Sequence, residues 1–261
     1  MRLEMKAKSE LILYHMMWMA DILMSPSMNR MGESFEEWAY KNGFRRQIKE
    51  LEKRGFLESD PVEKGGKRIL RLTREGVLRA LGGADPVARW DRPWDGKWRM
   101  AMFDLPETKR ALRNSLRKEL RAARFGCLQA SVWLTPDPVE DLLGKFMKKS
   151  GEESRTILFF SGHPCDGAAD ADLVKAAWSF TAINKAYRDY RAHLKELPRS
   201  GDEMRERLLD WGNVERDLWD RCMKLDPLLP RQLWPRRYLG ESAWNERLRA
   251  LKKAGSIAAS M

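Results

Sequence analysis

The stretch WRMAMFDLPETKRALRNSLRKELRAARFGCLQASVWLTP, residues 98–136, decides the fold of this chain. Its mainly apolar start, Trp98–Leu105, predicts a strand. Pro106 then opens a helix over Glu107–Arg124, in which leucines recur every four residues. A second strand is expected over Gly126–Leu134, where an apolar run of strand length returns. The stretch therefore predicts a strand, a helix and a second strand.

Two more elements are expected downstream. A short helix follows Pro138 and extends to about Lys149, and a third strand covers Thr156–Ser161. These helices are too short for a doubly wound sheet, and the order βαβαβ favours a ferredoxin-like sandwich over residues 94–165. With helical segments on both sides of this middle domain, the expected fold class is α+β.

Residues 1–82 predict a winged helix-turn-helix domain. Helical spacing of apolar residues indicates helices at 8–24, at Phe35–Tyr40 and at about 44–54. Gly55 is well placed to end the third helix, because glycine is favoured just past a helix end. Two short strands with proline and glycine between them follow, and three helices before such a hairpin are the plan of this DNA-binding domain.

The third helix and the hairpin carry the charge of a DNA-reading surface. Phe44, Ile48 and Leu51 share one helix face, so the basic residues point the opposite way. The hairpin strands are expected at Phe56–Glu58 and Lys67–Leu72, with a basic tip against the phosphates. The alternative is a winged helix that contacts only proteins. The predicted DNA-binding residues are Asn42, Arg45, Arg46, Lys49, Lys53, Lys64, Lys67 and Arg68.

The rest of the chain is expected to be helical. Asp85 and the prolines of Pro86–Pro93 indicate a linker before the middle domain. Residues 170–261 predict a helical C-terminal domain with helices at 170–195, 202–224 and 241–253. Most of its aromatic side chains should form the core, and some could line an apolar ligand pocket.

The net charge of +11 favours a polyanion or a membrane surface as partner. The excess is concentrated in residues 39–79, with twelve basic and six acidic residues, and in 109–124, with seven basic residues and one acidic. The second segment predicts a phosphate-binding face for an effector, because guanidinium groups pair with phosphate bidentately. Its five arginines share one side of a helical wheel: Arg110, Arg113, Arg117, Arg121 and Arg124. The DNA backbone and an acidic face of a second subunit are open alternatives.

Several function classes have no signal in the sequence. The glycine-rich nucleotide loops and the G-x-S-x-G elbow of serine hydrolases are absent. The cysteines Cys127, Cys165 and Cys222 form no C-x-x-C pair, which indicates a reducing cytoplasm. The three histidines lack metal-ligand spacing, and no apolar run is long enough for a membrane span. We therefore expect a cytoplasmic protein without signal peptide, membrane partner, metal or cofactor.

Three motifs follow one another along the second part of the chain. They are Trp94–Arg99 running into Phe103–Glu107, Phe125–Gln129 leading to Val132–Pro136, and Asp226–Pro230 before Leu233–Pro235. In their order and spacing they resemble one family, the PaaX-type repressors of phenylacetic acid degradation. In the N-terminal part the match lies mainly at Leu51–Leu57.

The resemblance implies a homodimeric repressor that is not an enzyme. It implies a winged helix that binds double-stranded DNA, a ferredoxin-like middle domain, and a helical C-terminal domain for effector binding and dimerisation. Family members release DNA when they bind an aromatic acyl-CoA, so the effector of this chain is expected to be a small molecule of that class. A third possibility is an adaptor for nucleic acid or protein without any effector.

The middle domain also resembles the small CRISPR-associated endonucleases of ferredoxin-like fold. In those enzymes a metal-binding aspartate ends the first strand, where Asp104 stands here. The alternative function is thus a metal-dependent nuclease centred on Asp104. Metal-dependent cleavage usually needs several converging oxygen ligands, and only Asp95 and Glu107 are near in sequence. We therefore expect Asp104 to cap the helix that begins at Pro106 or Glu107.

Overall fold

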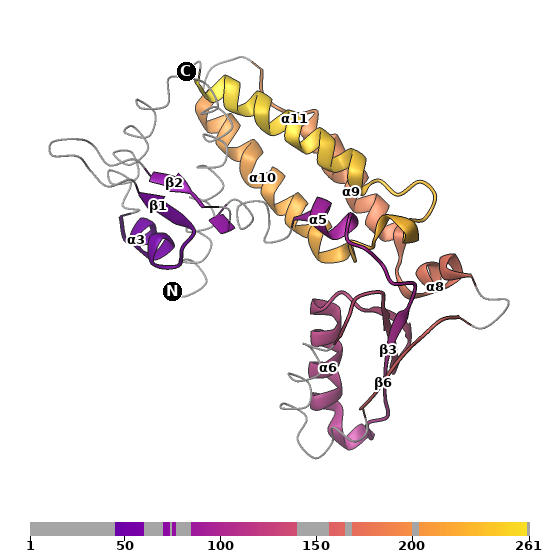
Figure 1. Cartoon of the computed structure of the whole chain (residues 1–261). Coiled ribbons are helices and arrows are strands. Elements are labelled where there is room, and N and C mark those ends of the chain that lie inside the picture. The colour runs from indigo at the N-terminus through magenta and orange to yellow at the C-terminus, as the bar shows by residue number, and fades with distance from the viewer. Residues whose placement is uncertain are drawn as a thin grey trace. The chain divides into compact units, whose positions relative to one another are not determined.

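The computed structural model describes seven parts of the chain, which are residues 45–59, 70–73, 75–76, 85–139, 157–164, 169–199 and 204–259 (Figure 1). Contacts divide the chain into two compact units. The central unit comprises Pro86–Arg188 and Arg221–Gly240. The other unit takes its described residues from Met1–Asp85, Asp189–Asp220 and Glu241–Met261. No helix among the described residues is long and apolar enough to cross a membrane.

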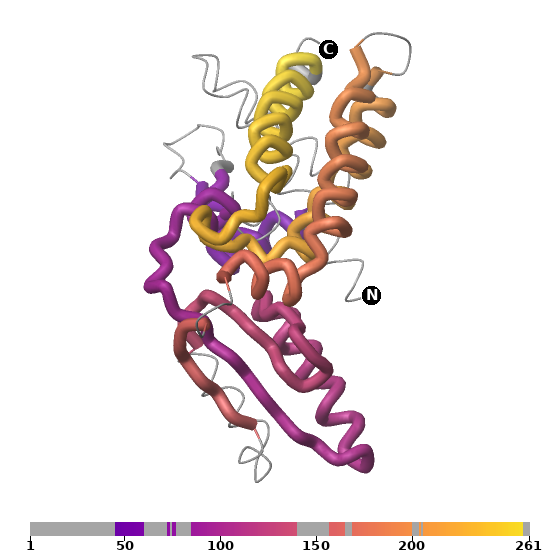
Figure 2. The backbone as a smooth tube through the Cα atoms, turned by 90° about the vertical axis from the view of Figure 1, so that its right-hand side faces the viewer, coloured from indigo at the N-terminus to yellow at the C-terminus, as the bar shows by residue number. Residues whose placement is uncertain are grey.

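A four-stranded antiparallel sheet forms the middle of the central unit. Its strands are β3 (Trp98–Phe103), β4 (Gly126–Gln129), β5 (Val132–Thr135) and β6 (Ile157–Gly162), in the order β4-β5-β3-β6. Figures 1 and 2 show β3 and β6 running side by side. The expected single strand Gly126–Leu134 is wrong, because the chain turns at Ala130–Ser131 and forms a hairpin. The α+β fold class is confirmed.

Helix α6 (Arg110–Ala122) covers one face of this sheet, after the short turn η1 (Glu107–Lys109). Leu116 and Leu120 point into the core, four residues apart on the same side of the helix. On the sheet, alternate residues face them, because side chains of a strand alternate between its two faces. The buried core of this layer consists of Ala101, Phe103, Leu105, Leu116, Leu120, Phe125, Trp133, Val139 and Ile157.

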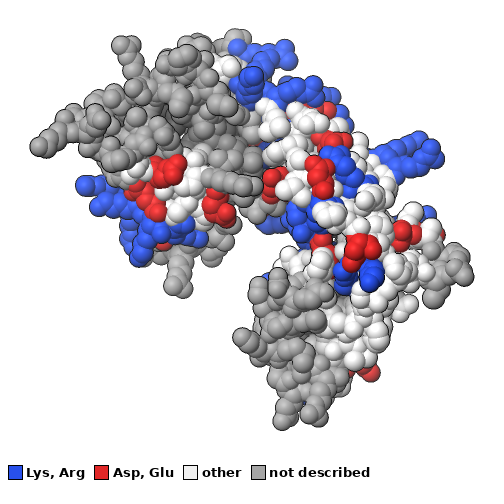
Figure 3. Space-filling model, viewed as in Figure 1, with Lys and Arg blue, Asp and Glu red and all other residues white. Residues whose placement is uncertain are grey.

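The opposite face of the sheet is also apolar. Met100 and Met102 of β3 lie on it, half-buried, and pair in register with Phe160 and Leu158 of β6. Phe160 and Leu158 are 52% and 51% exposed, although an antiparallel sheet that faces water normally carries polar residues there. The surface over these strands is largely free of charged side chains on the side shown in Figure 3. This apolar sheet face needs a cover that the described residues do not supply.

The expected linker contains a helix, α5 (Pro86–Trp90), followed by bends at Asp91 and Arg92. The linker prediction is wrong because Pro86 occupies the first position of this helix, which proline favours. The helix expected over 170–195 is divided into α8 (Asp170–Ala177) and α9 (Phe180–Leu194). The division occurs at Trp178, which takes an extended backbone conformation.

The central unit also holds the turn η3 (Arg231–Leu233) and a cluster of aromatic rings. Trp90 of α5 meets the rings of Trp234 and Tyr238 edge to face, at 5.6 and 6.2 Å between centroids. Tyr187 of α9 meets Tyr238 at 6.1 Å. These contacts anchor α5 to residues about 140 positions later in the chain, which a flexible linker would not do.

The other unit contains α3 (Arg45–Lys53), the paired strands β1 (Leu57–Ser59) and β2 (Leu70–Leu72), and most of two long helices. These are α10 (Met204–Leu225), close to its expected bounds, and α11 (Gly240–Ala259), which extends past its expected end at 253. β1 and β2 pair antiparallel with Leu57 opposite Leu72, so the predicted hairpin is present with shorter strands. The predicted helices at 8–24 and Phe35–Tyr40, and the one after Pro138, lie outside the described residues.

A buried ion pair stands at the centre of the long helices. The Nε of Arg247 on α11 donates to the carboxylate of Glu215 on α10, at 2.8 Å, and both side chains are buried. The hydroxyl of Tyr190 on α9 also donates to Glu215, at 2.6 Å. The Arg247 guanidinium lies over the rings of Trp219 and Trp244. Because each charge is paired and hydrogen-bonded, this burial does not leave an isolated charge in the core.

Candidate functional site

The basic face of α3 has the orientation that the sequence predicts. Ile48 and Leu51 are each only 1% exposed, so their face of the helix is buried. Four of the predicted DNA-binding residues lie exposed on the rest of the helix, and these are Arg45, Arg46, Lys49 and Lys53. The other four, Asn42, Lys64, Lys67 and Arg68, lie outside the described residues.

A glycine in the left-handed region ends α3. Gly55 has φ +72°, its N–H donates to the carbonyl of Glu52, and the next N–H, of Phe56, donates to Leu51. This pair of hydrogen bonds is a Schellman motif, which satisfies carbonyls at the helix end. The Thr73 hydroxyl donates to the Gly55 carbonyl at 2.6 Å, so the residue just after β2 holds the turn between helix and hairpin.

The arginines of α6 are held by neighbouring groups of the central unit. Arg113 pairs with Glu107 at 2.6 Å, and Arg117 donates to the carbonyl of Ala130 at 2.9 and 3.2 Å. The Arg121 guanidinium lies over the Trp133 ring, 5.2 Å from its centroid. Arg110, at the first position of the helix, is exposed.

Arg124 departs from the predicted helical face. α6 ends at Ala122. Arg124, two residues later, has φ +66° and so corresponds to Gly55, which stands two residues after the end of α3. Its N–H donates to the carbonyl of Arg121 and the next N–H, of Phe125, to Leu120, which is the same Schellman pattern. The prediction that all five arginines share one side of a helix is therefore wrong for Arg124.

The Arg124 side chain turns toward the segment that follows α10. Its Nη1 donates to the carbonyl oxygens of Met223, at 2.9 Å, and of Asp226. A left-handed backbone costs a residue with a side chain about 1–2 kcal/mol, so these two bonds offset a local strain. Arg124 thus ties the end of α6 to residues about a hundred positions later.

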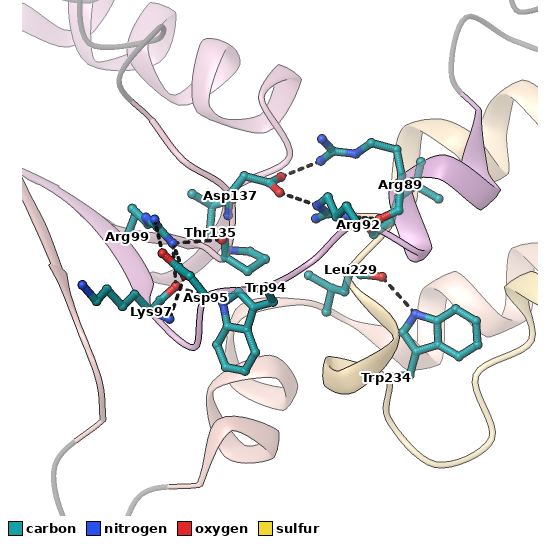
Figure 4. Close-up of polar contacts among 12 residues, drawn as sticks. Arg89, Arg92, Trp94, Asp95, Lys97, Arg99, Thr135, Asp137, Leu229 and Trp234 are labelled. Atoms are coloured by element: carbon teal, nitrogen blue, oxygen red, sulfur yellow. Dashed lines mark hydrogen bonds and ion pairs between the residues drawn. The ribbon is translucent and has the colours of Figure 1, made fainter.

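Two further arginines of the central unit meet at the carboxylate of Asp137 (Figure 4). Asp137 accepts from Arg89 at 2.5 Å through one oxygen and from Arg92 at 2.6 Å through the other. Arg92 also donates to the carbonyls of Arg89 and Leu228. Sequence reasoning missed Arg89 and Arg92 because they lay in an expected linker. The Asp85-Pro86 pair, a helix-start signal, could have revealed them.

Burial and neighbouring positive charges lower the pKa values of Arg92 and Arg124. Burial lowers the pKa of Arg92, and the nearby charges of Arg89 and Arg124 lower it further. Burial also lowers the pKa of Arg124, and Arg89 adds to that effect. Like charges this close destabilise one another unless anions lie between them, and Asp137 is one such anion.

Asp226 is a second buried carboxylate in this region. One oxygen accepts from the hydroxyls of Tyr187 and of Tyr238, the latter at 2.5 Å, and the other accepts from the backbone N–H of Leu228 at 2.7 Å. Burial raises the pKa of Asp226, although these hydrogen bonds and Arg124 oppose the change. Both oxygens of Asp226 therefore already accept hydrogen bonds from the protein, and these bonds stabilise the turn at Asp226–Leu228.

The Trp94–Arg99 motif forms a closed turn before β3. Asp95 accepts two bonds from Arg99, at 2.6 and 2.7 Å, and the backbone N–H of Lys97 donates to the same carboxylate at 3.0 Å. These bonds lower the pKa of Asp95 to about 2. Arg99 also donates to the Pro136 carbonyl, so the turn holds the start of β3 against the end of β5. Asp95 has a structural role here.

Asp104 is exposed just after β3. The turn that follows it has Pro106 at its N-cap and no side-chain cap, and α6 is likewise uncapped by a side chain. The expected capping role of Asp104 is therefore wrong. No group of three or more His, Cys, Asp or Glu side chains in the described ranges is arranged to hold a metal ion.

Comparison with known proteins supports the motif-based resemblance. Residues 91–174 match the family described as PaaX protein central Cas2-like domain. The chain is 25% identical over 202 residues to the transcriptional repressor PaaX of Escherichia coli strain K12. That match covers 74% of this chain and 62% of the relative, which is less than two thirds of its length.

A solved structure shares the fold over most of the chain. It is the uncharacterized protein Rv0674 from Mycobacterium tuberculosis, with a TM-score of 0.51 and 19% identity. The similarity covers 83% of this chain and 84% of that one. The sheet and α6 lie within the range 91–174 that matches the family, and α8 begins inside it. This part of the chain is therefore similar to the central Cas2-like domain of the PaaX family, and the resemblance of the chain to that family is confirmed.

Proposed function

We propose that this chain is a sequence-specific transcriptional repressor of the PaaX type, which binds double-stranded DNA and is released by a small-molecule effector. The similarity to a PaaX repressor supports this function. The observation that carries it is the α3 helix, which buries Ile48 and Leu51 and exposes a row of basic side chains. Residues 1–82 would form the winged helix-turn-helix, and the protein would act in the cytoplasm.

DNA recognition in this proposal divides between two parts of the N-terminal domain. α3 enters the major groove, where Arg46 and Lys49 contact base edges and phosphates. The hairpin tip, with Lys64, Lys67 and Arg68, lies against the backbone and adds affinity without sequence preference. The Schellman end of α3 and the Thr73 bond to Gly55 support this division, because they connect the helix to the hairpin strands.

The active repressor in this proposal is a homodimer. A twofold protein can read two half-sites of an operator, which raises affinity and specificity. The apolar sheet face of Met100, Met102, Leu158 and Phe160 supports self-association, since such a face needs a cover. Its middle domain would have the ferredoxin-like topology. Sedimentation velocity measures this state directly.

The effector in this proposal is an aromatic acyl-CoA. Its head group concentrates negative phosphates, which arginine binds through charge-assisted hydrogen bonds. The central unit supplies many arginines, and its aromatic cluster of Trp90, Trp234 and Tyr238 offers the kind of side chain that packs against flat rings. If the effector binds more tightly to a conformation of the repressor that does not bind DNA, it would shift the population toward that conformation and release the operator.

The experiment that tests the proposal uses an operator selected from random duplexes with the wild-type protein. Arg46→Ala combined with Lys49→Ala should weaken operator binding by about 1–3 kcal/mol for each hydrogen-bonded base that the variant no longer reads. It should also reduce the salt dependence by about one for each phosphate that is no longer neutralised. Binding is measured by fluorescence anisotropy over a range of salt concentrations.

The matched control is Lys252→Ala combined with Lys253→Ala, two exposed lysines of α11 in the same unit. It removes the same charge away from the proposed reading helix, so it should leave operator binding nearly unchanged. Equal weakening by both pairs would show a general charge effect and contradict the assignment of α3. Unchanged binding by the α3 pair would contradict it as well.

A further inference from the structure

Arg89, Arg92 and Arg124, which we call the inner arginine cluster, bring three guanidinium groups together in the central unit. Arg89 and Arg92 share Asp137. Arg92 and Arg124 donate to backbone carbonyls that are two residues apart, those of Leu228 and Asp226. The three residues come from α5, from the bend after it, and from the end of α6. Two segments that are separate in the sequence, α5 with the bend after it and the end of α6, thus converge on one positively charged site.

The anions near the inner arginine cluster do not balance its charge. Both oxygens of Asp137 are already used by Arg89 and Arg92. The oxygens of Asp226 accept from two tyrosines and a backbone N–H, and the bonds of Arg124 go to carbonyl oxygens. Three arginine charges therefore face two carboxylates, and burial disfavours the charged form of Asp226.

Two donors of the cluster have no hydrogen-bond partner in the described part of the chain. They are the Nε of Arg89 and the Nη2 of Arg92, and both atoms are buried. A buried donor without an acceptor costs about 1–3 kcal/mol, so such donors normally have a partner. The Arg89 side chain is 35% exposed and that of Arg92 is 16% exposed, so the cluster reaches the surface at Arg89.

We propose that the inner arginine cluster binds a phosphate group of a small-molecule ligand. A phosphate carries several acceptor oxygens and at least one further negative charge, which match the unpaired donors and the excess positive charge. The buried position of the donors favours a small ligand over duplex DNA, whose phosphates stay at the surface of a rigid backbone. The left-handed backbone of Arg124 is a local strain of the kind that is concentrated at ligand-binding sites.

This inference deepens the proposed function and rests on it in one respect, since it places the phosphates of the effector at this cluster. It keeps only Arg124 of the five arginines that the sequence predicted as a phosphate-binding face. Of the other four, Arg113, Arg117 and Arg121 are held by Glu107, by Ala130 and by the Trp133 ring.

The test is isothermal titration calorimetry of the full chain with inorganic pyrophosphate and with coenzyme A. Arg89→Gln removes one guanidinium that contacts only Asp137 among the hydrogen bonds described, and should weaken both ligands about tenfold or more. Arg89→Lys keeps the charge without the fork and should give an intermediate affinity. Arg110→Gln, an exposed arginine of the same unit, is the matched control and should change affinity less than about twofold.

Four outcomes decide the matter. Absence of binding to the wild type, or equal weakening by Arg89→Gln and Arg110→Gln, overturns the inference. If Arg89→Gln loses affinity for the operator but still binds pyrophosphate, the inference is overturned, because the cluster then contacts phosphates of the DNA backbone. A separate result distinguishes this inference from the proposed function. If pyrophosphate binds as expected but the wild-type protein neither binds an operator nor dissociates from it when acyl-CoA is added, the phosphate site is supported and the proposed repressor function fails. Thermal melting of each variant confirms that it is folded.

Discussion

Helices α3 and α6 are both amphipathic and rich in basic residues, and they differ in what their basic side chains contact. Each buries two aliphatic residues, Ile48 and Leu51 in α3 and Leu116 and Leu120 in α6. Each ends in the same pair of backbone hydrogen bonds. The lysines and arginines of α3 lie exposed, whereas most arginines of α6 and its end are held by a glutamate, by carbonyl oxygens and by an aromatic ring.

The difference shows that a basic helical face is not by itself a binding surface. A guanidinium that donates to a carbonyl, such as Arg117 to Ala130, has part of its hydrogen-bonding capacity used within the fold. A lysine on an exposed face, such as Lys49, keeps its capacity for a partner. Three substitutions test how far this contrast between the two helices holds.

The largest effect is expected from Arg124→Ala at the end of α6. The variant keeps a left-handed backbone and leaves the carbonyls of Met223 and Asp226 without their donor. It should lower the free energy of unfolding by about 2–4 kcal/mol, measured by urea denaturation. A loss below about 0.5 kcal/mol would show that the side chain adds little to the fold.

A smaller effect is expected from Gly55→Ala, at the equivalent position after α3. An alanine Cβ would meet no atom within 4 Å there, so the cost comes only from the φ of +72°. The free energy of unfolding should fall by about 1 kcal/mol in the same denaturation experiment. If Gly55→Ala lowers the free energy of unfolding more than Arg124→Ala does, the end of α3 matters more for stability than the end of α6, which contradicts the comparison.

The smallest effect is expected from Glu107→Gln, which breaks the pair with Arg113. Glu107 is 76% exposed, and exposed pairs contribute little because water screens them. The free energy of unfolding should fall by at most about 0.5 kcal/mol. The same variant is also tested for binding to nonspecific DNA. If it binds such DNA more tightly than the wild type, the pair with Glu107 normally keeps Arg113 from contacting DNA, and this difference from the exposed basic residues of α3 is larger than stability alone shows.

Local patterns predicted most of the elements, because helix periodicity and capping residues act over a few positions. α3 lies within one residue of its predicted bounds, and Gly55 stops it as expected. The hairpin of β4 and β5 was missed because its turn, Ala130–Ser131, lacks glycine, proline and asparagine. A shift in strand register between Cys127 and Gln129 also breaks the regular alternation there.

The candidate site was harder to predict, because its contacts join distant segments. Arg89 and Arg92 meet Asp137 about 45 positions later, and Arg124 reaches Asp226 about a hundred positions later. Periodicity cannot report such pairs, and the helical wheel placed Arg124 on a helix that ends before it. The basic face of α3 was predictable because burial of Ile48 and Leu51 alone decides which side faces outward.

The central unit is assembled from two pieces of chain, Pro86–Arg188 and Arg221–Gly240, and this has a consequence for its synthesis. The carbonyls that receive Arg124 and the carboxylate that receives Tyr187 belong to the second piece. During translation Arg124 leaves the ribosome about a hundred residues before the carbonyls of Met223 and Asp226, a delay of about 5–20 seconds at ordinary elongation rates. Until then Arg124 and Tyr187 must stay solvated, so the unit completes its packing only after Gly240 has emerged.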